Sequence, residues 1–159
     1  MKFNEYENLV KQLFASLVEH VDGLPCNSAK GGRTNHEMGA SGYQHQIDVS
    51  VRTATELHLI ECKYWKRRVT PDALLSLAAR VQDIRKANPG WTVKGAVATT
   101  QGYSAGVAKL AEFFNVTLQR VGSAQEFAFD YRNQINLHVI TESVAVTDDD
   151  VNAELVPLV

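Results

Sequence analysis

Apolar residues recur at helical spacing near the start of the chain, and this spacing predicts a helix over residues 4–21. The apolar positions of that helix are Tyr6, Val10, Leu13, Leu17 and Val21. Residues 22–46 follow neither a helical nor a strand pattern and are rich in glycine. We therefore expect a long loop there, and a loop of this length in a compact domain is usually functional or mobile.

The middle of the chain carries two strand patterns separated by a short turn. Residues 47–52 alternate between apolar and polar side chains, whereas residues 57–64 are apolar on both faces. Residues 53–56 connect them, so the two segments predict an antiparallel hairpin. The second strand should be central in its sheet, because a strand that is apolar on both faces is covered on both sides.

The second half of the core alternates between helix and strand. Thr70 precedes Pro71 and Asp72, a combination typical of a helix start, and that helix should stop at Asn88. A strand over residues 92–100, a helix over 105–115 capped by Ser104, and a strand over 116–121 follow. The predicted order is α-β-β-α-β-α-β, an α/β fold with a mixed central sheet flanked by helices.

Residues 122–159 form a separate segment in this interpretation. Residues 127–131 and 135–139 both alternate between apolar and polar positions. We therefore divide the chain into a core of residues 1–121 and a β-rich C-terminal extension, which packs on the core or on a partner and ends in an acidic tail.

Composition and charge narrow the class of protein. The chain has 159 residues, of which 45% are hydrophobic and 21% charged, an ordinary mixture for one globular domain. The longest stretch without Asp, Glu, Lys or Arg is Gly95–Ala108, too short for the ~20 apolar residues of a membrane span. The two cysteines lack a CxxC arrangement, so a reducing, cytoplasmic setting is expected.

The net charge of −2 is distributed unevenly along the chain. The last 18 residues contain five acidic residues and no Lys or Arg, so residues 1–141 carry a net charge of +3. The overall charge argues against a dedicated nucleic-acid binder, but the mildly basic body does not.

The predicted hairpin brings carboxylates and an ammonium group together. Glu61 and Lys63 share one face of the second strand, while Cys62 points to the other. Because antiparallel pairing folds the chain back, Asp48 can lie beside Glu61. Mg²⁺ suits such a pair of carboxylates. If the reaction is hydrolysis of a phosphodiester, Lys63 can orient the attacking water or neutralise charge in the transition state. The alternative is a surface salt bridge between Glu61 and Lys63.

Glu7 has two possible roles on the first helix. It lies at the end of a core-facing stripe with Val10 and Phe14, from which it could reach toward the hairpin. Alternatively, Asn4 caps the helix and Glu7, three residues later, binds its backbone in a capping box. Both remain open from the sequence.

The candidate residues described above are Asp48, Glu61-Cys62-Lys63 and Glu7, and the later part of the core contains the segment AVATTQGYSAGVAKLAEFFNVTL. Together they resemble the PD-(D/E)xK nuclease superfamily. Within it, residues 4–121 look like the catalytic domain of Mrr-type restriction endonucleases. The resemblance implies a restriction-endonuclease-like fold, Mg²⁺-dependent DNA hydrolysis, and catalytic roles for Asp48, Glu61 and Lys63. It also implies metal contacts from Asp48, Glu61, the backbone carbonyl of Cys62, and Glu7 as an auxiliary acid. Ile47 departs from the pattern, which has proline there.

Basic residues near these positions suggest how DNA would be held. Lys66, Arg67 and Arg68 directly follow the second strand of the hairpin and could grip phosphates, although a solvated turn is the alternative. Further candidates for DNA contact are Lys30, Arg33 and Gln46.

The sequence thus predicts a DNA endonuclease of restriction or defence type that uses Mg²⁺, with Mn²⁺ as a substitute. A structure-selective enzyme, such as a Holliday-junction resolvase or repair nuclease, is the first alternative, because 159 residues leave little room for a sequence-reading domain. A catalytically silent DNA-binding module is the second. Cleavage of both strands usually needs two active sites, so we expect a homodimer, with a separate specificity or accessory protein as a possible partner and no membrane partner.

Overall fold

The computed structural model describes residues 1–64 and 66–122, and these form three helices and seven strands. In chain order they are α1 (Phe3–His20), β1 (Ser28–Gly31), β2 (His36–Met38), β3 (Gln44–Gln46), β4 (Val49–Arg52), β5 (Glu56–Lys63), α2 (Pro71–Ala87), β6 (Thr92–Thr99), α3 (Ala105–Phe114) and β7 (Val116–Arg120). The predicted C-terminal extension lies outside the described residues, apart from its first residue.

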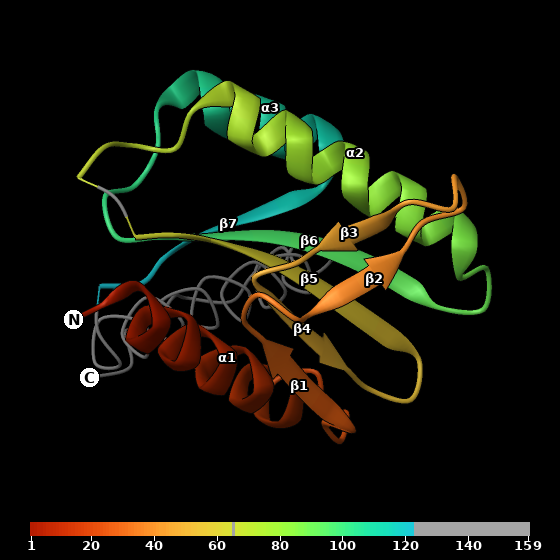
Figure 1. The fold of residues 1–159 in the computed structure, drawn as a ribbon. Coiled ribbons are helices and arrows are strands. Elements are labelled where there is room, and N and C mark those ends of the chain that lie inside the picture. The colour runs from red at the N-terminus through yellow and green to blue at the C-terminus, as the bar shows by residue number, and fades with distance from the viewer. Residues whose placement is uncertain (65, 123–159) are drawn as a thin grey trace, which may run out of the picture.

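A mixed five-stranded sheet organises the fold, in the order β1-β4-β5-β6-β7. The strands β1, β4 and β5 are antiparallel neighbours, whereas β5, β6 and β7 run parallel. Two helices, α2 and α3, cover one face of the sheet, and α1 covers the other (Figure 1). The predicted α/β architecture, with a mixed sheet flanked by helices, is therefore confirmed.

The long loop expected over residues 22–46 is wrong, because it contains three strands. β1 pairs with β4 at the sheet edge, and β2 and β3 form a separate two-stranded hairpin. These strands have only three or four residues and almost no apolar alternation. Hydrogen bonds hold the segment instead: the Asn35 amide donates to the Ile47 carbonyl at 2.9 Å, and the Ser50 hydroxyl donates to Asn35 at 3.1 Å.

The start of α1 also differs from the capping box proposed for Asn4 and Glu7. The helix begins at Phe3, and the Glu5 carboxylate accepts a hydrogen bond from the backbone N–H of Lys2 at 2.7 Å. Asn4 therefore lies inside the helix and Glu5 takes the role expected of Glu7. Glu7 is left on the buried face of α1.

Strand β5 divides the core into two layers. Leu57 and Leu59 pack toward α2 and α3, while Ile60 and Cys62 pack toward α1. The predicted caps fix where the covering helices begin. Thr70 accepts from the N–H of Ala73 at 3.4 Å, and Ser104 accepts from the N–H of Val107 at 3.3 Å. Each helix thus starts near the end of the strand that precedes it and returns across the sheet.

Close packing of α2 on the sheet depends on a glycine. A Cβ at Gly95 in β6 would lie 2.8 Å from Cγ2 of Val81. Only a residue without a side chain lets the helix approach β6 this far. Among the described residues, no helix is both long and apolar enough to cross a bilayer.

Candidate active site

Asp48 and Glu61 meet at the open end of the β4–β5 hairpin, away from the turn that connects the two strands. The antiparallel register pairs Val49 with Ile60, so one step further along each strand brings Asp48 opposite Glu61. The backbone N–H of Cys62 donates to Oδ2 of Asp48 at 2.8 Å. The end of β5 therefore holds the Asp48 side chain directly, and the two carboxylates lie side by side.

Glu61 faces α2 and has a cation on each carboxylate oxygen. Lys63 Nζ lies 2.6 Å from Oε1, and Arg80 Nη1 lies 3.0 Å from Oε2. The side chains of Glu61 and Lys63 are mostly buried, while that of Arg80 is 33% exposed. The salt bridge that was the alternative explanation for Glu61 and Lys63 is present, and a carboxylate opposite Glu61 accompanies it.

Arg80 was missed from the sequence, although α2 carried a signal for it. Leu77 and Ile84 are buried on α2, and Arg80 is three residues after the first and four before the second. These spacings put Arg80 on the core-facing side of the helix. An arginine at such a position needs a buried or half-buried partner, and Glu61 is that partner.

Two carboxylates at this site, Asp48 and Glu7, have a raised pKa. Burial raises the pKa of Asp48, and the neighbouring charge of Glu61 raises it further. Burial also raises the pKa of Glu7, with a second contribution from Asp48, while Arg33 acts in the opposite direction. Burial and neighbouring negative charge therefore both disfavour the ionised forms of Asp48 and Glu7, and a nearby cation would offset both effects.

Glu7 reaches this region from α1 and is 8% exposed. It lines a cavity of about 370 Å³ that is shared with Arg33, Gly31 and Gly32 at the end of β1. Glu7, Asp48 and Glu61 are not all within 4.8 Å of one another, since the single trio of that kind among the described residues lies elsewhere. Glu7 thus borders the Asp48–Glu61 pair and does not form a tight three-carboxylate cluster with it.

The residues expected to contact DNA occupy different places. Gln46 Nε2 lies 3.4 Å from Oδ1 of Asp48, so this amide borders the carboxylate pair. The basic residues that follow β5 are Lys66, Arg67 and Arg68, and all three are exposed. Lys30 lies on the edge strand β1 and is exposed as well.

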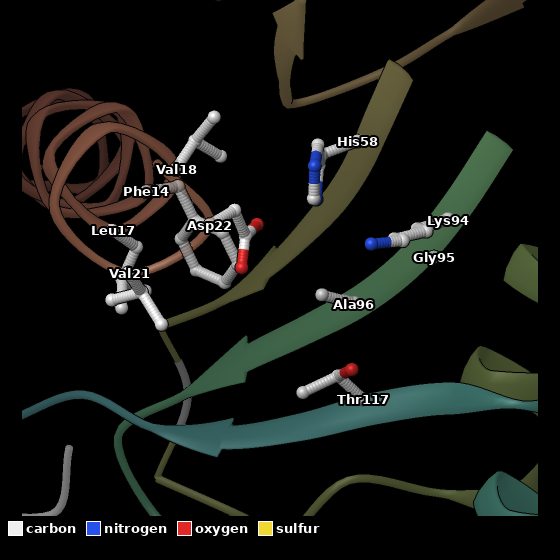
Figure 2. A pocket seen from close by; sticks show the side chains of 10 residues that line it. All are labelled: Phe14, Leu17, Val18, Val21, Asp22, His58, Lys94, Gly95, Ala96 and Thr117. Atoms are coloured by element: carbon white, nitrogen blue, oxygen red, sulfur yellow. The ribbon is translucent and has the colours of Figure 1, made fainter. Parts of the chain in front are cut away.

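A second group of potential metal ligands lies at the opposite end of β5. Ligand atoms of Asp22, Glu56 and His58 all lie within 4.8 Å of one another. Figure 2 shows the side chains of Asp22, His58 and Lys94 around a cavity of about 210 Å³ between α1 and the sheet. The trio is therefore a candidate metal site, distinct from the predicted one.

Ion pairs already occupy the carboxylate of Glu56. Lys94 Nζ lies 2.6 Å from Oε1 and His58 Nε2 lies 2.8 Å from Oε2. Burial acts to raise the pKa of Glu56, but the hydrogen bonds from Lys94 and His58 outweigh it and lower the pKa. Sequence patterns did not reveal this group, because Asp22 is far in sequence from the strand that carries the other two.

No family model and no curated protein matches the chain. The chain is, however, similar to solved structures. The protein of unknown function AF1548 has a TM-score of 0.57 and 21% identity, over 75% of this chain and 58% of its own. Protein VC1899 from Vibrio cholerae has a TM-score of 0.55 and 17% identity, over 74% of this chain and 30% of its own. The chain therefore spans less than two thirds of either protein.

These two similarities show a shared fold. Weaker similarity, with a TM-score of 0.46 and 18% identity, is found to the MspJI restriction endonuclease in complex with a 27-mer oligonucleotide. That match covers 75% of this chain and 26% of the MspJI chain. The Mrr-type resemblance stays a prediction.

Proposed function

We propose that this chain is a metal-dependent DNA endonuclease that hydrolyses phosphodiester bonds, of restriction or defence type. The observation that carries the proposal is the pairing of Asp48 with Glu61 at the open end of the β4–β5 hairpin, with Lys63 Nζ 2.6 Å from Glu61. Two carboxylates and an ammonium group on adjacent strands can hold a divalent cation and a water molecule beside a phosphate.

The residues present fit Mg²⁺. Asp48 and Glu61 offer hard carboxylate oxygens, the backbone carbonyl of Cys62 follows Glu61 directly in β5, and Glu7 borders the pair. Burial first, and a neighbouring carboxylate second, raise the pKa of Asp48 and of Glu7, so a bound cation would favour the ionised forms of both. When bound, Mg²⁺ would polarise the phosphodiester and lower the pKa of a coordinated water. Mn²⁺ favours similar oxygen ligands and should replace it.

The protein's own groups define the rest of the chemistry. Lys63 orients the attacking water and stabilises the negative charge that develops on the phosphate oxygens. Arg80 holds the second oxygen of Glu61 and so restricts the rotation of that carboxylate. The N–H of Cys62 does the same for Asp48. In this proposal the site is preorganised, and little side-chain movement precedes reaction.

The exposed basic segment after β5 would bind the DNA backbone. Lys66, Arg67 and Arg68 follow within five residues of Lys63, so phosphates gripped there lie close to the proposed site. Arg33, in the cavity beside Glu7, and Lys30, on the edge strand, extend the positive charge toward the N-terminal end of β4.

Cleavage of both strands needs two such sites, and we therefore propose a homodimer, with a separate specificity or accessory protein where a particular sequence must be recognised. Sedimentation of the purified chain at micromolar concentration, with and without DNA, measures this directly. A mass equal to one chain under both conditions would contradict the dimer.

Plasmid, linear duplex and branched DNA, incubated with the chain and Mg²⁺ or Mn²⁺, test the activity. We expect nicking or cutting that stops when the metal is chelated. Lys63→Ala should lower the rate by about 10²-fold or more, since one positioned group commonly contributes this much. Lys109→Ala, on the exposed side of α3, is the matched control and should cut at the wild-type rate.

Three results would each contradict a part of the proposal. DNA binding without cleavage under any divalent metal would indicate a catalytically silent module. Unchanged cleavage by Lys63→Ala would remove the role given to that residue. Preferential cleavage of branched over linear duplexes at equal concentration would replace the restriction type with a structure-selective nuclease.

A further inference from the structure

The β2–β3 hairpin is anchored through its inner face and its turn. Glu37 and His45 are cross-strand partners in the register. Glu37 forms an ion pair with Arg52 of β4, and Nε2 of His45 lies 2.8 Å from Oδ2 of Asp83 on α2. Both side chains that point inward are therefore used to fasten the hairpin to the domain.

The turn of the hairpin is fastened to the same aspartate. The Ser41 hydroxyl donates to Oδ2 of Asp83 at 2.6 Å, and the Ser41 N–H donates to Oδ1 at 2.9 Å. The N–H of Ala40 donates to the backbone carbonyl of Asp83 at 3.1 Å. A Cβ at Gly39 would lie 1.9 Å from Oδ2 of Asp83, so this approach requires glycine. The hairpin is thus held in a fixed position beside α2 (Figure 1).

The outer face of the hairpin has no comparable role in the fold. The residues that point outward are exposed, and they are His36, Met38, Gln44 and Gln46. Met38 is 48% exposed, and Tyr43 in the turn is 66% exposed. This outer face contains no acidic residue, no lysine and no arginine. A rigid ribbon therefore presents neutral hydrogen-bonding groups and two large apolar groups to the outside.

This outer face is continuous with the proposed catalytic centre. Gln46 lies at its near end, where the side-chain amide is 3.4 Å from Asp48. Gln44, two residues further along the same face, points the same way because side chains alternate along a strand. Along the hairpin, the carboxylate of Asp48 is followed by the amides of Gln46 and Gln44. The thioether of Met38 and the phenol of Tyr43 come after them.

We propose that the outer face of the β2–β3 hairpin enters the major groove of duplex DNA next to the phosphate that is cut. This inference rests on the proposed function and adds the element that contacts the bases. The major groove admits a two-stranded ribbon, and glutamine there pairs with the N6 and N7 atoms of adenine. Apolar side chains contact the methyl group of thymine. A neutral face is suited to base edges, whereas phosphates are bound by the basic residues after β5.

The test measures duplex affinity in Ca²⁺, which replaces Mg²⁺ without cleavage, for the wild type and a Met38→Ala/Gln44→Ala double variant. Neither residue belongs to the catalytic machinery, and the anchoring face is unchanged. We expect about tenfold weaker binding, as removal of one good base contact implies. At saturating DNA the cleavage rate in Mg²⁺ should stay within about twofold of wild type, because both substituted residues act in binding alone. Phe113→Ala, 81% exposed on α3, is the control and should bind normally.

A second duplex, in which 7-deazaadenine removes the N7 acceptors from the major groove, separates contact with the bases from nonspecific DNA binding. Wild type should bind this duplex several-fold more weakly than normal DNA, and the double variant should no longer distinguish the two. Equal affinity of the variant and the wild type, equal sensitivity to the base analogue, or no duplex binding by the wild type would each overturn the proposal. Wild-type binding without cleavage would contradict the proposed function, whereas the comparison of the two duplexes would still decide whether the hairpin contacts base edges in the major groove.

Discussion

Replacing Arg80 with methionine tests the electrostatics of the proposed site most directly. In the structure both oxygens of Glu61 have cationic partners, Lys63 at 2.6 Å and Arg80 at 3.0 Å. A divalent metal must share Glu61 with these cations. Methionine keeps much of the apolar stem of arginine and removes its charge, so Arg80→Met should free one carboxylate oxygen for the metal.

The size of the effect follows from the exposure of the pair. Arg80 is one-third exposed and makes a single contact to Glu61, so the pair contributes about 0.5–1 kcal/mol, the range for solvated ion pairs. A free-energy difference of about 1.4 kcal/mol equals a factor of ten. Arg80→Met should therefore lower the Mg²⁺ concentration for half-maximal cleavage by about two- to fivefold.

Titration of cleavage with Mg²⁺, together with calorimetry of Mg²⁺ binding without DNA, measures this change. Lys86→Met removes one positive charge from the same helix at an exposed position, and should leave both titrations unchanged. A higher Mg²⁺ requirement for Arg80→Met would refute the reasoning, because it would mean that Arg80 assists metal binding.

Two further predictions concern groups outside the catalytic pair. Glu56→Gln should lower the free energy of unfolding by about 1 kcal/mol and Tm by about 2–4 °C at pH 7. The folded-state pKa of Glu56 is lowered, so its contribution to the free energy of unfolding is full above the ordinary pKa of 4.5 and is lost as the pH falls through the folded pKa. The thermal melts of the two proteins should therefore converge at that pH. A constant difference in Tm down to about pH 3 would contradict the ion-pair explanation. Replacing Lys66, Arg67 and Arg68 with alanine should reduce the slope of log affinity for duplex DNA against log salt by about 0.9 for each phosphate that is no longer neutralised; an unchanged slope would place the phosphate-binding groups elsewhere.

The sequence allowed the central hairpin to be predicted because its information is local. Alternation over residues 47–52 and continuous apolarity over 57–64 indicated two strands, and antiparallel pairing then brought Asp48 near Glu61 by counting alone. The helix starts at Thr70 and Ser104 were predictable for the same reason, since a cap is set by a few neighbouring residues.

The parts that the sequence did not show depend on contacts between distant segments. Strands β1 to β3 are too short to carry an apolar pattern, and partners such as Asp83 and Arg52 hold the hairpin in place. Arg80 of α2 contacts Glu61 of β5, and α2 itself packs closely on β6 at Gly95. A polar contact of this kind leaves no periodicity, and hydrophobic patterns cannot reveal it.

Charge balance at the candidate site links these contacts to the proposed activity. Three carboxylates there face three cations. The carboxylates are Glu7, Asp48 and Glu61, and the cations are Arg33, Lys63 and Arg80. The site without metal is therefore close to neutral, which is how several charged groups remain half-buried together. A divalent cation would leave an excess of two positive charges, and a phosphodiester is the group that this excess attracts. Binding of metal and of DNA should consequently strengthen each other by the same factor, since coupling between two ligands is reciprocal.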